Sequence, residues 1–389
     1  MLTPLLAAFP RTVGPLLELL DETLPPADGA SALSAIMAHG PNEALTATEN
    51  AQPAILLTSI AILRVLEEQY SLPVAAAAPG SSSGSSGGGG EGGGGGAGVG
   101  GSSKSETGTD AAGETDFFLG HSLGEFSALV AARVLNLADA LRLVRRRGEV
   151  MCDCARRVSL PEMDGGPGET GMVALLVEPP FLAGLLRAVD AFVASETLPN
   201  DEFLAVANVN SASQIVLSGH LKAIAACIGH LRRFAGHDPR ALRLNVSAPF
   251  HSMVMAPAVP VVERMLAAMP VNFARVGAGA GAGEGKGVGV VANVTARPYA
   301  SADELRTLLA RQCTATVRWA ESVRYLDRDR GVSRWIGIGP GKVAINLVGR
   351  EVRGGMASVI PVEGCDAHNI EAAVRRLQRT DDEGAEGQG

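Results

Sequence analysis

The feature that most constrains this chain is a tight turn placed between a short apolar run and an apolar helical pattern. The turn reads Gly-His-Ser-Leu-Gly at residues 120–124. This pattern is typical of a nucleophile elbow, in which a serine sits on a sharp strand-to-helix turn. We expect a Cβ at either glycine to collide with the neighbouring strand or helix. The helix that follows should direct backbone N–H groups at the place where an oxyanion would form.

The five-residue pattern alone leaves two interpretations of Ser122 open, a nucleophile or a helix N-cap serine. Residues 80–84 also match Gly-x-Ser-x-Gly, but they lie in low-complexity sequence. Ser122 instead follows the apolar run Phe-Phe-Leu and precedes an apolar helical pattern. The context, and not the motif, therefore favours Ser122 over Ser82.

Composition excludes several classes of function. The chain has 389 residues, of which 46% are hydrophobic, and this is enough for one large core or two domains. A net charge of −8 argues against general nucleic-acid binding. No run of 18 apolar residues predicts a transmembrane helix, and the start resembles neither a signal peptide nor an Arg-rich transit peptide. The five cysteines are scattered without a zinc spacing, so they predict free thiols and no metal site.

Three segments cannot contribute to a packed core. Residues 79–114 are rich in Pro, Gly and Ser, and they predict a disordered insertion ahead of the elbow strand. Residues 276–289 form a Gly/Ala tract that we interpret as a loop, followed by a strand at 290–296. Residues 379–389 read as an acidic, flexible tail.

The region 166–245 predicts a separate α+β unit. Its hydrophobic patterns follow the order strand, helix, strand, strand, helix, strand. This order is that of the split βαβ, or ferredoxin-like, arrangement.

The decapeptide at 120–129, Gly-His-Ser-Leu-Gly-Glu-Phe-Ser-Ala-Leu, resembles the active-site signature of malonyl-CoA:acyl carrier protein transacylases and of acyltransferase domains of fatty-acid and polyketide synthases. Other segments resemble that family in the same order, including Gln-Pro-Ala at 52–54, Phe-His-Ser at 250–252 and Gly-Pro-Gly at 339–341. The resemblance implies a hydrolase-like α/β large domain with a parallel sheet and nucleophile elbow, and an inserted ferredoxin-like α+β subdomain.

The expected organisation has three parts of the large domain, at 1–78, 115–165 and 246–378, around the 79–114 insertion and the 166–245 subdomain, with a tail at 379–389. The family normally opens with a strand and a Gly-Gln-Gly loop whose glutamine completes the oxyanion hole. This chain starts after that point, so we expect one core strand and one oxyanion donor to be missing.

The resemblance assigns the acyl-transfer chemistry to Ser122 and His251. A serine is a weak nucleophile unless a base removes its proton, and histidine is the usual base. Of seven histidines, His121 adjoins the serine, but adjacent side chains diverge on an elbow, so we reject it. His251 lies within Phe-His-Ser and matches the family's catalytic histidine. The backbone N–H of Leu123 is the expected oxyanion donor, and Gln312 is the candidate that orients the histidine.

Four further residues are substrate-binding candidates. Arg147, within Arg-Gly-x-x-Met, matches the arginine that binds the malonyl carboxylate in the family, and a guanidinium suits bidentate carboxylate binding. The neighbouring Arg142 and Arg145 are expected on a solvated face. Phe250 precedes the histidine as in malonyl-selective domains. Gln52 and Asn210 also match family segments, although a polar helix cap and a turn-organising residue are the alternative interpretations.

The resemblance and these residues together imply ping-pong transfer of a malonyl group from malonyl-CoA to the phosphopantetheine thiol of acyl carrier protein, in fatty-acid biosynthesis. No metal or redox cofactor is implied, and we expect no nucleic-acid or membrane partner and a monomer. The alternatives are a serine hydrolase or thioesterase with the same elbow, and a truncated inactive family member. The expected compartment is the mitochondrial matrix, with the cytoplasm as the alternative.

Overall fold

The structure is a computed structural model that describes residues 2–72, 115–159, 168–195, 198–199, 201–234, 236–276, 287–363 and 366–386. The insertion predicted at 79–114 lies outside these residues, as does most of the Gly/Ala tract. Within the described part, no helix is both long enough and apolar enough to cross a membrane.

The N-terminal part is helical, and its last helix lies at the centre of the large domain. The helices are α1 (Thr3–Ala8), α2 (Pro10–Thr23), α3 (Leu33–His39), α4 (Asn42–Thr46) and α5 (Thr48–Tyr70). Apolar residues occur on nearly every side of α5, which is the pattern of a helix buried all round. It packs against α2, α6 (Gly124–Ala131) and α7 (Leu137–Val158).

The large domain contains two pairs of parallel strands. β1 (Thr115–Phe118) pairs with β6 (Gly287–Val290), and β7 (Trp335–Gly339) pairs with β8 (Val359–Glu363). The remaining helices of this domain are α10 (Val259–Ala268), α11 (Ala302–Arg311), α12 (Trp319–Arg324), α13 (Val343–Glu351) and α14 (Ala367–Glu386), with short turns at Met253–Ala258, Phe273–Arg275, Tyr325–Asp329 and Gly355–Ser358.

Three boundaries differ from the sequence prediction. The loop expected to extend to residue 289 ends earlier, because β6 begins at Gly287, and the strand expected at 290–296 stops at Val290. Position 289 within β6 requires glycine, because a Cβ there would come 2.6 Å from the ring of Phe117 on β1. Helix α14 continues to Glu386, into the predicted flexible tail. Once a helix has formed, each further residue adds one hydrogen bond, and no proline interrupts this segment.

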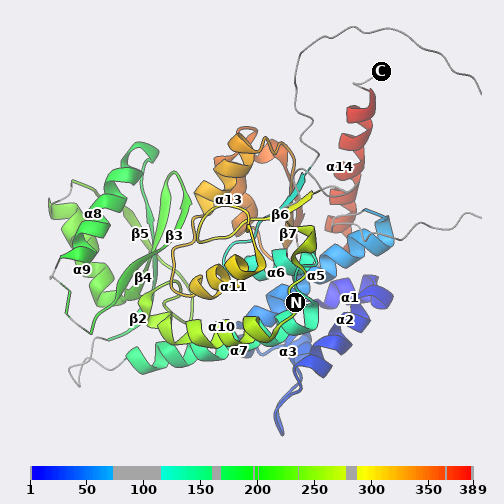
Figure 1. The fold of residues 1–389 in the computed structure, drawn as a ribbon, viewed down its shortest axis with the longest axis horizontal. Coiled ribbons are helices and arrows are strands. Elements are labelled where there is room, and N and C mark those ends of the chain that lie inside the picture. The colour runs from blue at the N-terminus through cyan, green and yellow to red at the C-terminus, as the bar shows by residue number, and fades with distance from the viewer. Residues whose placement is uncertain are drawn as a thin grey trace, which may run out of the picture.

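The small subdomain has the predicted ferredoxin-like topology, at one end of the molecule (Figure 1). Its chain order is β2 (Thr170–Leu176), a short turn at Pro179–Phe181, α8 (Leu182–Ala194), β3 (Leu204–Ser211), β4 (Gln214–His220), α9 (Leu221–Phe234) and β5 (Arg240–Arg243). The strands form an antiparallel sheet in the order β3-β4-β2-β5. Its helices cover an apolar cluster separate from the large-domain core.

Strand β3 also attaches the subdomain to the large domain. The N–H of Val209 donates to the carbonyl of Val317 at 3.0 Å, and the N–H of Val317 donates to Ala207 at 2.8 Å. This short parallel bridge places the end of β3, with Asn210, beside the turn that carries Ser122.

Candidate active site

The turn after β1 is a strained elbow, as the motif predicts. Ser122 has φ +52°, a left-handed conformation that few non-glycine residues adopt, and α6 begins two residues later. A Cβ at Gly120 would lie 1.9 Å from the backbone of Gly124, so the first glycine of the motif is required. The same prediction for Gly124 is wrong, because a Cβ there would meet no atom within 4 Å.

This difference gives a matched test of the elbow. Gly120→Ala should lower the free energy of unfolding by more than about 3 kcal/mol, because the strand and the helix backbone would have to separate. Gly124→Ala should change it by less than about 1 kcal/mol, since alanine favours a helix and the space is open. Denaturant unfolding followed by circular dichroism measures both variants. Equal losses would contradict this account of the turn.

The elbow places Ser122 against His251, as predicted. The Ser122 Oγ lies 2.7 Å from Nε2 of His251, and Nδ1 of the same ring lies 2.9 Å from the backbone oxygen of Gln312. That carbonyl can only accept, so Nδ1 carries the proton and Nε2 is free to accept the serine proton. Burial, and then the nearby Arg147 charge, lower the pKa of His251 to about 3. The imidazole is therefore neutral and in its basic form.

His121, the histidine that the sequence analysis rejected as the base, has other partners. Its Nε2 lies 2.9 Å from Oδ1 of Asn210, and its ring packs edge-on against Trp319 with centroids 5.1 Å apart. Asn210, near the end of β3, also donates to Oε1 of Gln214, the first residue of β4, at 3.2 Å. The pair of His121 and Asn210 thus connects the elbow to the small subdomain.

Helix α7 brings the guanidinium of Arg147 to the same place. This side chain is only 2% exposed. Its two terminal nitrogens donate to the amide oxygens of Gln52, at 2.8 Å, and Gln312, at 3.0 Å. Among the residues that the structure describes, no carboxylate forms an ion pair with it, and its buried Nε has no hydrogen-bond partner. A buried cation whose hydrogen-bond partners are neutral amides is a ready site for an anionic group.

The neighbouring arginines of α7 are engaged elsewhere. Arg146 is exposed and pairs with Glu149 at 2.9 Å, and Arg142 pairs with Asp139 at 3.2 Å. Arg145 was expected to be solvated, but it is half-buried because it donates to Asn50 Oδ1 at 2.6 Å. The structure therefore separates Arg147 from the rest of the arginine run.

Two further candidates, Leu123 and Phe250, lie next to Ser122 and His251 in the chain. The backbone N–H of Leu123, just before α6, makes no hydrogen bond within the described residues, so it is free to bind an oxyanion. Phe250 is half-buried and packs against both the large-domain core and an apolar cluster of the small subdomain. It therefore lies where the two units meet, immediately before His251.

The sequence analysis missed three buried residues that hydrogen-bond to the elbow or to one another, namely Asn293, Glu125 and Tyr299. Asn293, after β6, accepts from the N–H of Ser122 at 2.7 Å and donates to the Gly120 carbonyl at 2.7 Å. The carboxylate of Glu125 accepts from the hydroxyl of Tyr299 and from the N–H of Asn293. The one available signal was an acidic residue within the otherwise apolar start of α6.

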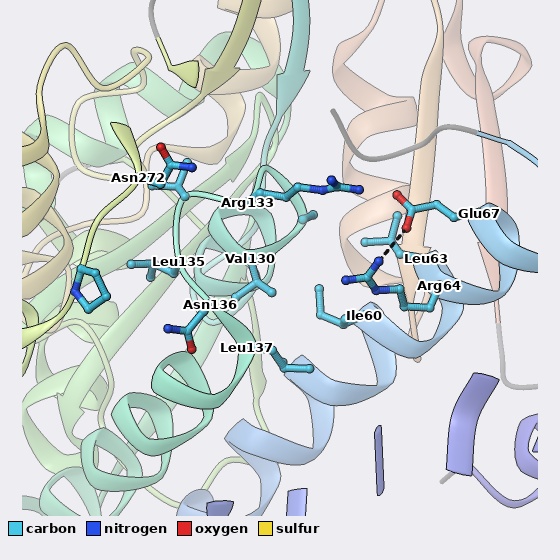
Figure 2. A pocket seen from close by; sticks show the side chains of 13 residues that line it. Ile60, Leu63, Arg64, Glu67, Val130, Arg133, Leu135, Asn136, Leu137 and Asn272 are labelled. Carbon is cyan, nitrogen blue, oxygen red and sulfur yellow. Dashed lines mark hydrogen bonds and ion pairs between the residues drawn. The ribbon is translucent and has the colours of Figure 1, made fainter. Parts of the chain in front are cut away.

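A cavity of about 410 Å³ lies away from these residues, between α5 and the turn from α6 to α7 (Figure 2). Ile60, Leu63 and Val130 line it, and Arg64 beside it pairs with Glu67 at 3.3 Å. Because Ser122 precedes α6 and the cavity lies at the other end of that helix, the cavity is not the acyl-binding site. Elsewhere in the described ranges, no three His, Cys, Asp or Glu side chains gather as metal ligands would.

An elbow serine, a buried neutral histidine and an unpaired buried cation define a serine-nucleophile enzyme of the α/β-hydrolase-like class. No family model matches the chain. It is 31% identical over 362 residues to the malonyl CoA-acyl carrier protein transacylase of Bacillus subtilis, covering 93% of this chain and 88% of that protein. It is 30% identical over 360 residues to the Escherichia coli K12 transacylase of the same description, covering 90% and 88%.

Solved structures agree. A malonyl-transacylase in complex with a type II PKS acyl-carrier protein matches with a TM-score of 0.68 and 27% identity, covering 97% of this chain and 94% of that one. An acyl-carrier-protein S-malonyltransferase from Bartonella henselae matches with a TM-score of 0.67 and 28% identity, covering 97% and 95%. The chain belongs to the malonyl-CoA:acyl carrier protein transacylase family.

Proposed function

We propose that this protein transfers a malonyl group from coenzyme A to the phosphopantetheine thiol of an acyl carrier protein, through an ester on Ser122. The observation that carries the proposal is the unpaired, buried guanidinium of Arg147 beside the Ser122–His251 pair. A hydrolase of simple esters has no need for a fixed buried cation, whereas a malonyl thioester presents a free carboxylate at its far end.

In the first half-reaction, Nε2 of His251 takes the proton from Ser122 Oγ, which attacks the thioester carbonyl carbon. The oxygen of the tetrahedral intermediate, which is negatively charged, accepts from the Leu123 N–H at the start of α6. When the carbon–sulfur bond breaks, the thiolate of coenzyme A takes the proton from His251. The malonyl group remains as an ester on Ser122, with its carboxylate held by Arg147.

In the second half-reaction, the same residues act in reverse order. His251 takes the proton of the carrier's thiol, and the sulfur attacks the ester carbonyl. Ser122 leaves and recovers its proton from His251. A buried, neutral imidazole whose Nδ1 is fixed by the Gln312 carbonyl suits both directions, because one tautomer serves as base and, once protonated, as acid.

The test is to measure coenzyme A release from malonyl-CoA with and without phosphopantetheinylated carrier, and to identify the modified residue by mass spectrometry. We expect one rapid turnover and a malonyl ester on Ser122 without carrier, and sustained turnover with it. Sustained release without carrier would instead indicate a hydrolase or thioesterase. Absence of any Ser122 ester on folded protein would indicate an inactive family member.

We further propose that the protein acts as a monomer in fatty-acid biosynthesis and needs no cofactor besides its two substrates. We also propose the mitochondrial matrix as its compartment, with the cytoplasm as the alternative.

A further inference from the structure

The carboxylate of Glu125 is the least exposed charged group near the site. It lies on the first turn of α6 and is 1% exposed. Oε1 accepts from the Tyr299 hydroxyl and from the Asn293 N–H at 3.1 Å, and Oε2 accepts from Nε2 of Gln312 at 2.6 Å. Burial raises the pKa of Glu125 to about 7, and these hydrogen bonds oppose the rise.

The amide of Gln312 is fixed between groups of opposite hydrogen-bonding character. Its Nε2 donates to Glu125 and to the carbonyl of Ser122 at 2.9 Å, both of which can only accept there. Its Oε1 accepts from Arg147 at 3.0 Å, and a guanidinium can only donate. Only one of the two amide orientations satisfies all three neighbours.

We propose that Glu125 is a positioning residue that, by accepting from Nε2, keeps the Gln312 amide oxygen directed at Arg147 and so sets the selectivity for acyl groups that carry a carboxylate. The inference rests on the proposed function of the Ser122 site. The other amide on Arg147, that of Gln52, is held less firmly, because its Nε2 has the Met151 sulfur as partner at 3.8 Å. Gln312 is therefore the stronger of the two supports of the guanidinium.

Glutamine at position 125 cannot replace the carboxylate. If the NH₂ group of the new glutamine faced Gln312, the Gln312 amide would have to rotate by half a turn. The NH₂ group of Gln312 would then face the Arg147 guanidinium. If the NH₂ group of the new glutamine faced the other side, it would meet the Asn293 backbone N–H, which cannot turn. Both orientations bring two donors together in a buried place, whereas an ionised carboxylate accepts at both oxygens.

The experiment compares kcat/KM for malonyl and acetyl thioesters, with carrier as acceptor, at a pH above the pKa of Glu125, where its carboxylate is ionised. Glu125→Gln should lower the malonyl-to-acetyl ratio roughly 10- to 100-fold, because the guanidinium loses its aligned acceptor. Gln312→Met removes the same acceptor and keeps the backbone carbonyl that holds His251, so it should lower the ratio similarly. It also provides the test if Glu125→Gln does not fold.

Ser127→Ala is the matched control, since Ser127 is buried on the same helix and its Oγ has no hydrogen-bond partner. It should leave the ratio unchanged. A purely structural role for Glu125 would lower kcat/KM equally for both thioesters and leave the ratio unchanged in Glu125→Gln, and that result overturns the inference. A wild-type protein that transfers no malonyl group overturns the proposed function as well. An unchanged ratio in both Glu125→Gln and Gln312→Met, beside an active wild type, overturns this inference alone.

Discussion

Ser122→Ala should lower kcat for malonyl transfer by about 10⁴- to 10⁶-fold, because no other hydroxyl of the described residues contacts Nε2 of His251. His251→Ala should cost a similar factor, and the double variant should be little worse than either single one. Residues that act as a unit lose their joint effect when either is removed. Steady-state assays of coenzyme A release with carrier protein measure all three variants.

Ser127→Ala is the control for this pair. Ser127 lies on the same helix, is buried, and its Oγ has no hydrogen-bond partner. Its replacement should leave kcat within about twofold of the wild-type value, since alanine removes no hydrogen bond at this position. If Ser122→Ala kept more than a hundredth of the wild-type rate, the nucleophile would have to be another residue.

Arg147→Ala should lower kcat/KM for the malonyl thioester by about 10²- to 10³-fold and change that for the acetyl thioester much less. Arg147 is the only buried Arg or Lys among the described residues, so the malonyl carboxylate would lose its cationic partner. The acetyl group carries no charge and needs no such partner. Arg147→Lys should recover little of the loss, because an ammonium cannot bind a carboxylate in the bidentate way. The measurement is the kcat/KM ratio of the two thioesters.

Arg146→Ala is the neighbouring control, since Arg146 is exposed and paired with Glu149. It should leave the ratio unchanged. An undiminished malonyl preference in Arg147→Ala would show that the carboxylate binds elsewhere.

Arg147→Ala should also alter the pH dependence of kcat/KM. Burial and then the Arg147 charge lower the pKa of His251, so removing the charge raises that pKa. Activity requires the neutral imidazole, and the acid limb of the profile should therefore move to higher pH in Arg147→Ala. The wild-type limb should lie far below the ordinary histidine range, and Arg146→Ala should keep it there.

Much of the site could be predicted from the sequence because its strongest constraints are local. Gly120 is needed where strand and helix backbones nearly touch, and such a turn exposes one serine. The order of strands and helices in 166–245 was enough to indicate the ferredoxin-like sheet that the structure contains. The segments that carry His251 and Arg147 were recognisable one by one, and the structure brings both to Ser122.

The supporting residues could not be predicted, because their roles depend on contacts between distant parts of the chain. Gln312 was expected to orient the histidine, yet its side chain also reaches the Ser122 carbonyl, 190 positions away, and the Arg147 guanidinium. The local sequence also predicted a solvated Arg145 and a Gly124 without room for a Cβ. Both predictions were wrong, because exposure and free space depend on where other elements lie. The sequence by itself determined which groups we propose for the chemistry, since a strained turn and titratable side chains leave local patterns. Only the tertiary structure decided how those groups are held, because a buried hydrogen bond depends on where its partner's backbone passes.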